Sequence, residues 1–110
     1  MKVKFYLTSS GRSPVEEFIK EQSEGIRTDF LDAVNLLAEG EILSMPLNRN
    51  LSNIYRGLHE IRLKDAFGSI RIFYFLKKGD AIYMLHAFKK KTQELPKKEI
   101  ELVLKRIREV

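Results

Sequence analysis

Hydrophobic and polar residues alternate in the first segment of the chain, residues 2–8 (KVKFYLT). The apolar side of this alternation has Val3, Phe5 and Leu7, and the other side has two lysines and a tyrosine. A period of two residues is typical of a β-strand that has one face on the core. The pattern therefore predicts a half-buried strand at the start of the chain.

A short helix is expected next, in the segment SPVEEF. Ser13 is a favourable N-cap, and Pro14 suits the first helical position, where a missing N–H costs nothing. Glu16 lies three residues after the cap, which is the spacing of a capping box. The segment therefore predicts a helix that begins at Pro14 and ends around Gln22.

Two longer helices are predicted by apolar residues that recur at spacings of three and four. The first is expected from about residue 24 to residue 39, with Gly40 as its C-terminal stop. The second begins at Pro96 and runs to the C-terminus, and its basic residues lie mostly off its apolar side. The apolar positions are Ile26, Phe30, Ala33, Val34 and Leu37 in the first and Ile100, Val103, Leu104 and Ile107 in the second.

Three strand-like runs lie between these helices, at residues 57–64, 69–77 and 81–88, after a loop that contains Pro46 and the segment NRN. The connections between the runs are short and contain glycine, which favours antiparallel hairpins. The predicted order is strand, two helices, three strands and helix, in a single domain over residues 1–110. The expected fold class is α+β, with a mostly antiparallel four-stranded sheet, two N-terminal helices on one face and a C-terminal helix.

Side-chain alternation along these strands brings charged and aromatic residues to one face of the sheet. If Ile61 and Ile70 pack under the helices, the opposite face carries Glu60, Arg62, Lys64, Arg71, Phe73 and Phe75. Guanidinium groups beside aromatic rings suit single-stranded RNA, which needs cations for its phosphates and flat rings for its unstacked bases. The alternative is that Glu60 pairs with the neighbours of Arg62 and that the two phenylalanines form a second layer of core.

A soluble globular protein is expected from the composition, with 44% hydrophobic and 32% charged residues. No apolar run approaches the length of a membrane span and the first residues lack the pattern of an export signal, so a cytoplasmic location is expected. The chain has no cysteine and two histidines, His59 and His86. This composition predicts no disulfide, no protein-held metal ion and no cofactor.

The net charge of +5 is unevenly distributed along the chain. Residues 1–40 carry five Lys or Arg and seven Asp or Glu, whereas residues 41–110 carry fifteen and eight. A one-sided positive field attracts phosphate backbones, and it equally attracts an acidic protein partner. Lys89, Lys90 and Lys91, where the last strand ends, either extend this basic surface or guard a strand edge against pairing.

Residues 57–106 resemble the HigB-like, phage-derived branch of the RelE/ParE toxin superfamily. The shared features are E-x-R at 60–62, a glycine-led R-I-F-Y at 71–74, LHAFKKKT at 85–92 and PKKEI at 96–100 before a basic helix end. The preceding strand and helix pair agree with the family in order and length. Two features differ, because the C-terminal segment has no tyrosine and Leu95 stands where a threonine cap is usual.

The resemblance implies a RelE-like fold and the toxin of a toxin–antitoxin pair, which cleaves messenger RNA on the ribosome without a metal ion. Its partner would be a cognate antitoxin, a helix-turn-helix protein, and no membrane is involved. Catalysis would rest on Arg62, Arg71, Lys89 and Lys90. Contacts to RNA would come from Lys64, Phe73, Lys91, Lys97 and Lys98, with His59 as a weaker candidate for the general base and His86 as a core or boundary residue.

Two other functions remain open from the residues alone. A ParE-like protein of the same fold would inhibit a DNA topoisomerase by binding it, and messenger RNA would stay intact. A basic nucleic-acid-binding protein without chemistry would cause no growth arrest when expressed. The basic strand face favours the RNA-cleaving toxin, because one surface would then unite the arginines and lysines.

Overall fold

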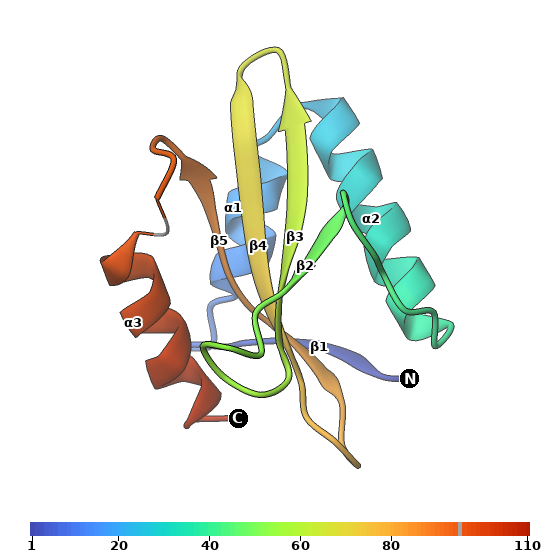
Figure 1. The fold of residues 1–110 in the computed structure, drawn as a ribbon, viewed down its shortest axis with the longest axis vertical. Helices are drawn as coiled ribbons and strands as arrows, with labels where there is room; N and C mark the ends of the chain where they lie inside the picture. Colours follow the sequence, from blue (N-terminus) through green and yellow to red (C-terminus); the bar gives the residue numbers. More distant parts are fainter. Residues whose placement is uncertain (95) are drawn as a thin grey trace.

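A five-stranded sheet with helices on both faces forms the fold in a computed structural model, which describes residues 1–94 and 96–110 (Figure 1). Its elements are β1 (Val3–Phe5), α1 (Pro14–Lys20), α2 (Glu24–Ala38), β2 (Asn48–Asn50), β3 (Leu58–Asp65), β4 (Gly68–Leu76), β5 (Ile82–Lys90) and α3 (Lys97–Ile107). The α+β class and the order of the elements are confirmed. Leu95, the expected site of an altered helix cap, lies outside the described residues.

The strand order in the sheet is β1-β5-β4-β3-β2. The prediction of four strands was wrong, because the polar segment NRN forms β2 rather than a loop and pairs antiparallel with residues 59–61 of β3. The two long hairpins, β3–β4 and β4–β5, are antiparallel, whereas β1 runs parallel to β5. Both edge strands are only three residues long, so β3, β4 and β5 make up most of the sheet.

Each face of the sheet packs against its own hydrophobic core. The first core joins α1 and α2 to one face through Val15, Ile26, Phe30 and neighbouring residues, together with Ile61 and Ile72 of the strands. The second core joins α3 to the opposite face. Its buried members are Leu51, Leu58, Phe73, Leu85, Phe88, Val103 and Ile107. The expected placement of the two N-terminal helices on one face is therefore confirmed, and α3 covers part of the other face.

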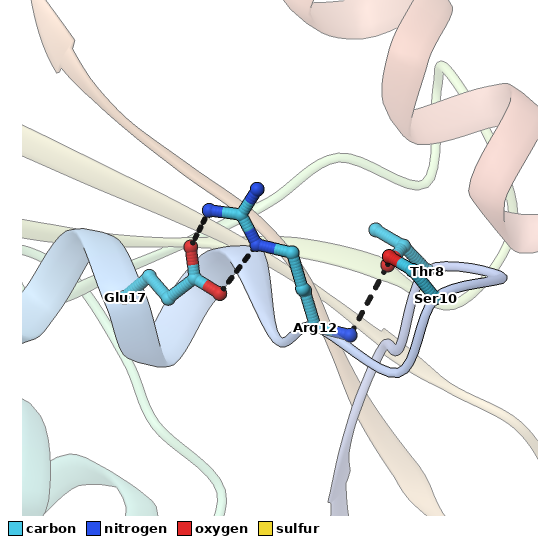
Figure 2. Close-up of polar contacts among 4 residues, drawn as sticks. All are labelled: Thr8, Ser10, Arg12 and Glu17. Carbon is cyan, nitrogen blue, oxygen red and sulfur yellow. Dashed lines mark hydrogen bonds and ion pairs between the residues drawn. The ribbon is translucent and has the colours of Figure 1, made fainter.

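The start of α1 differs in one detail from the capping box expected there. Ser13 is the N-cap and Pro14 the first helical residue, but the Ser13 side chain makes no capping hydrogen bond and its buried Oγ has no partner among the described residues. The helix also ends at Lys20 rather than near Gln22. The chain enters α1 through a turn in which the Arg12 N–H donates to Thr8 Oγ1 over 3.1 Å (Figure 2).

Side-chain pairs from neighbouring segments also hold the two N-terminal helices. The Arg12 guanidinium donates two hydrogen bonds to the Glu17 carboxylate of α1, which lowers the pKa of Glu17 (Figure 2). At the start of α2, Ser23 Oγ accepts a hydrogen bond from the Ile26 N–H and donates one to Asp65 at the end of β3. These contacts tie the turn between α1 and α2 to the tip of the β3–β4 hairpin.

A β-bulge interrupts the pairing of β4 with β5. Phe73 pairs with His86 and Tyr74 pairs with Met84, so Leu85 is the extra residue of β5. A bulge of this kind bends the strand and turns two successive side chains toward the same face. Here Leu85 packs in the second core, and the neighbouring His86 contacts Glu99 of α3. Within the residues that the structure describes, no helix is long and apolar enough to cross a membrane.

Candidate nucleic-acid interface

Arg62 and Arg71 lie directly opposite each other on β3 and β4. Residues in register on neighbouring strands point to the same face, so both guanidinium groups lie on the side of the sheet that α3 covers in part. The Arg62 side chain keeps 27% of its accessible surface and the Arg71 side chain 11%. The pKa of Arg71 lies below its ordinary value, mainly because the guanidinium is buried; the nearby Arg62 lowers this pKa further and Glu60 opposes the shift.

A buried carboxylate lies between these two arginines. Glu60 is only 1% exposed, and its Oε1 is 3.5 Å from Arg62 Nε and 3.7 Å from Arg71 Nε. Glu60 alternates with Arg62 on β3 and pairs in register with Phe73 of β4, so it shares the face of the arginines. The alternative that Glu60 pairs with the neighbours of Arg62 is therefore confirmed for Arg71, and Arg62 itself is a second partner.

A depression of about 570 Å³, open to solvent, adjoins the arginine pair. Its lining combines two acidic residues of α2, Asp29 and Asp32, with the apolar residues Leu47 and Leu63 and with both arginines. The pairing of β3 with β2 ends at Ile61, and the next residue, Arg62, donates its N–H to Leu47 O over 2.7 Å. Beyond this point the last residues of β3 form the edge of the sheet. A flexible chain can therefore reach the arginines from that edge.

The lysines predicted around the arginines fall on two different faces. Lys64 and Lys90 both pair in register with Ser69, which alternates with Arg71 on β4, so these two lysines share the face of the arginines. Lys89 is opposite Ile70 and lies on the other face, with its Cε beside Gly68. The expectation that Lys89 joins the arginines is therefore wrong, because successive residues of a strand point to opposite sides.

Three further lysines predicted to contact RNA are exposed but belong to other parts of the chain. Lys91 follows the last residue of β5, and Lys97 and Lys98 begin α3. The side chains are free to meet a ligand at the surface. Their positions extend the basic surface beyond the sheet and do not add to the arginine pair.

Phe73 is the clearest correction to the predicted interface. Its side chain is completely buried and stacks on Phe88 at a centroid distance of 5.7 Å, within the core beneath α3. A ring without exposed surface cannot stack on a nucleobase. The alternative that Phe73 and Phe75 belong to a second layer of core is therefore confirmed, with Phe75 partly buried there.

Both histidines make structural contacts. His59 lies on the face of α1 and α2, where its ring stacks on Tyr74 and its Nδ1 is 3.2 Å from Asn48 Nδ2. Burial lowers the pKa of His59. The sheet separates His59 from the arginine pair, so the geometry does not support a role as general base. His86 is half-buried at the boundary between β5 and α3, where it contacts Glu99.

Glu60 is the residue whose importance the sequence analysis did not recognise. Alternation places Glu60 on the face of the arginines, and the E-x-R motif contains it, but neither pattern indicates that its side chain is buried. The missed signal is an acidic residue inside a predicted strand, two positions before an arginine on the same face, since acidic residues are almost never fully buried unless paired. Among residues 1–94 and 96–110, no three His, Asp or Glu side chains gather into a group that could hold a metal ion.

Comparison with known proteins identifies the family of the chain. The family model "Phage derived protein Gp49-like (DUF891)" matches residues 17–108. This range includes the second half of α1 and all of α2, the strands β2 to β5, and α3. No curated protein matches the chain. The match covers the arginine pair, Glu60 and the basic end of β5. The chain belongs to the phage-derived Gp49-like family, which is related to the RelE/HigB-like toxins.

Proposed function

We propose that this protein is a metal-independent endoribonuclease that cleaves messenger RNA on the ribosome as the toxin of a toxin–antitoxin pair. The observation that carries the proposal is the pair of arginines in register on β3 and β4, at the border of a solvent-open depression. Membership of a family related to RelE/HigB-like toxins supports it. So does the position of Lys64 and Lys90 on the face of the arginines.

RNA cleavage of this kind needs few groups from the protein. The 2′-hydroxyl oxygen of the RNA attacks the neighbouring phosphorus, its proton passes to a base, and the bond from phosphorus to the 5′-oxygen breaks as that oxygen gains a proton. The products are a 2′,3′-cyclic phosphate and a 5′-hydroxyl. Arg62 and Arg71 bind the phosphate and stabilise the charge that develops in the transition state. Lys90 is the candidate proton donor to the leaving oxygen, because it lies on the same face.

A cognate antitoxin is the second part of the proposal. The basic face around Arg62, Arg71 and Lys90 attracts an acidic or amphipathic segment of a partner, which would cover the site and stop cleavage. Titration of the toxin with the product of the neighbouring reading frame, followed by an RNA cleavage assay, tests this proposal. Cleavage that continues undiminished in a saturated complex would contradict it.

The decisive experiment measures messenger RNA cleavage by ribosome-bound protein together with growth arrest. Arg71→Ala should lower the cleavage rate by about a hundredfold or more, as the loss of one preorganised donor does elsewhere. Arg71→Lys should restore only part of the rate, since a point charge cannot replace a planar fork of donors. Protein treated with EDTA should retain its activity once the magnesium that the ribosome needs is restored.

Controls separate this function from the alternatives. Thermal melts of both Arg71 variants must show folded protein, because an unfolded variant would report only on stability. A folded and fully active Arg71→Ala protein would move the active site away from this face. Growth arrest with intact messenger RNA and an inhibited topoisomerase would replace the proposal with the binding function of a ParE-like protein.

A further inference from the structure

Glu60 is an acidic residue that the sheet has almost removed from solvent. Its accessible surface is 1%, and it lies within β3 between His59 and Ile61. Burial of a carboxylate is costly unless charges or hydrogen bonds compensate for it. The residues around Glu60 must therefore supply that compensation.

The compensation comes from two arginine side chains that approach the carboxylate through the same nitrogen. Arg62 Nε and Arg71 Nε are 3.5 and 3.7 Å from Glu60 Oε1. These distances are ion pairs rather than normal hydrogen bonds. Neither the two carboxylate oxygens nor the two Nε atoms have a hydrogen-bond partner among residues 1–94 and 96–110. The site therefore holds its charges close together without closing the hydrogen bonds between them.

The use of Nε leaves the terminal nitrogens of both guanidinium groups for other partners. Within the described residues, Arg71 Nη1 donates a hydrogen bond to Ile70 O over 3.2 Å. Each guanidinium still has donors for an anion at its outer end, because the fork carries five N–H groups. One carboxylate against two guanidinium groups leaves a single positive charge, which matches the single negative charge of a phosphodiester.

We infer that Glu60 is a positioning residue, whose buried carboxylate holds Arg62 and Arg71 by their Nε atoms so that their outer nitrogens receive one phosphodiester group of the RNA. The inference rests on the proposed function. A carboxylate with 1% exposed surface does not reach the substrate, so Glu60 acts through the arginines. Without it, two adjacent guanidinium groups repel each other and each can turn toward solvent.

Glu60→Gln tests the inference in the cleavage assay, because glutamine keeps the shape of the side chain and removes its charge. We expect kcat to fall by about a hundredfold, as small displacements of positioned groups do elsewhere, with a smaller change in KM. In an Arg71→Ala background the same substitution should cost much less, since one of the two groups that Glu60 positions is already absent. Equal losses in both backgrounds would overturn the inference.

A matched control removes a different glutamate that is paired with an arginine. Glu17→Gln breaks the exposed pair with Arg12 that Figure 2 shows. Glu17 belongs to α1, which packs on the face of the sheet opposite the arginines. The cleavage rate of this variant should equal that of the wild type. If Glu60→Gln does not fold, Glu60→Asp serves instead, because it keeps the charge and shifts it by one methylene. A Glu60→Asp protein with the full wild-type rate would overturn the inference.

A second measurement decides the positioning without RNA. The Nε atoms of Arg62 and Arg71 are buried beside the Glu60 carboxylate, although they make no hydrogen bond. Because burial keeps water away, their Nε–Hε signals, assigned by their loss in Arg62→Lys and Arg71→Lys, should exchange slowly with solvent in the wild type. Glu60→Gln should remove this protection from both signals, and unchanged protection would overturn the inference. If the wild type cleaves no RNA, the proposed function fails, and the Nε signals still show whether Glu60 holds the arginines.

Discussion

At the scale of single residues, sequence alternation predicted the face of the sheet to which a side chain points. It did not predict whether another element buries that side chain. It placed Arg62 and Arg71 on one face of the sheet, and the structure has them in register. It placed Phe73 on the same face, but α3 and Phe88 bury that ring. Alternation gives the side to which a residue points, whereas only the packed helix determines what meets it there.

The two neighbouring lysines at the end of β5 offer a test of the interface at this scale. Lys90→Ala should lower the RNA cleavage rate by about a hundredfold, the range of a lost proton donor, because Lys90 shares the face of Arg71. Lys89→Ala should leave the rate near that of the wild type, because Lys89 lies on the other face beside Gly68. Single-turnover cleavage with both variants is the measurement.

The two lysine variants control for each other in charge. Each removes one positive charge from the same strand, so a general loss of attraction for RNA would affect both equally. A Lys89→Ala protein that loses as much activity as Lys90→Ala would contradict the assignment of faces. It would also show that net charge, and not position, governs the reaction.

At the scale of elements, helices were easier to predict than short strands. The helix expected over residues 24–39 is α2, which is observed over Glu24–Ala38. Prediction and structure agree because apolar residues recur along the whole helix and Gly40 marks its end. β2 has three polar residues and no period that can be recognised. Backbone pairing with β3 determines it, and the side chains carry no signal of that pairing.

Gly57, just before β3, allows a test at this scale. Its φ is +93°, and an added Cβ would lie 2.8 Å from Leu76 O of β4. The Leu76 N–H also donates to Gly57 O over 2.8 Å, so the two strands are tied together here. Gly57→Ala should lower the free energy of unfolding by roughly 1–3 kcal/mol, the cost of a strained backbone residue. Urea denaturation gives this value.

Gly25 in α2 is the control for this substitution. An added Cβ there meets no atom within 4 Å, and the residue has a helical backbone. Gly25→Ala should raise the free energy of unfolding by about 0.4–1 kcal/mol, because alanine has fewer unfolded conformations to lose. Similar stability of the two variants would mean that the backbone at Gly57 relaxes without cost.

At the scale of the whole molecule, the uneven charge of the sequence becomes a difference between two sides. Most acidic residues of the first forty belong to α1 and α2, which pack on one face of the sheet. The arginine pair and the basic α3 belong to the opposite face. This polarity was predictable once the charges were assigned to elements, because the two N-terminal helices share a face.

The pH dependence of folding is a prediction for the molecule as a whole. Burial lowers the pKa of His59 and of His86 from the ordinary value of 6.5. The unfolded chain therefore binds protons near pH 6.5 that the folded chain does not yet bind, and the free energy of unfolding falls as the pH drops from 7 toward 5. Urea denaturation at pH 7, 6 and 5 measures this loss.

His59→Gln should make that loss smaller. Glutamine keeps a polar group near Asn48 and does not titrate, so the contribution of His59 disappears and that of His86 remains. The range above pH 5 avoids the carboxylates, whose ordinary pKa values are lower. An unchanged slope in the variant would show that His59 binds its proton equally well in the folded and the unfolded chain.

The bulge at Leu85 decides which lysine the interface receives. Before it, Ile82 and Met84 lie on the side of α1 and α2, whereas after it the odd-numbered Ala87 takes that side. After the extra residue, the even-numbered side chains of β5 point to the face of the arginines, and the odd-numbered ones point to the other face. Phe88 and Lys90 therefore lie on the face of the arginines. If the same residues paired with β4 without a bulge, Leu85 would pair with Phe73 and Lys89 instead of Lys90 would lie opposite Ser69. A single backbone irregularity thus sets the chemistry of a surface several residues away.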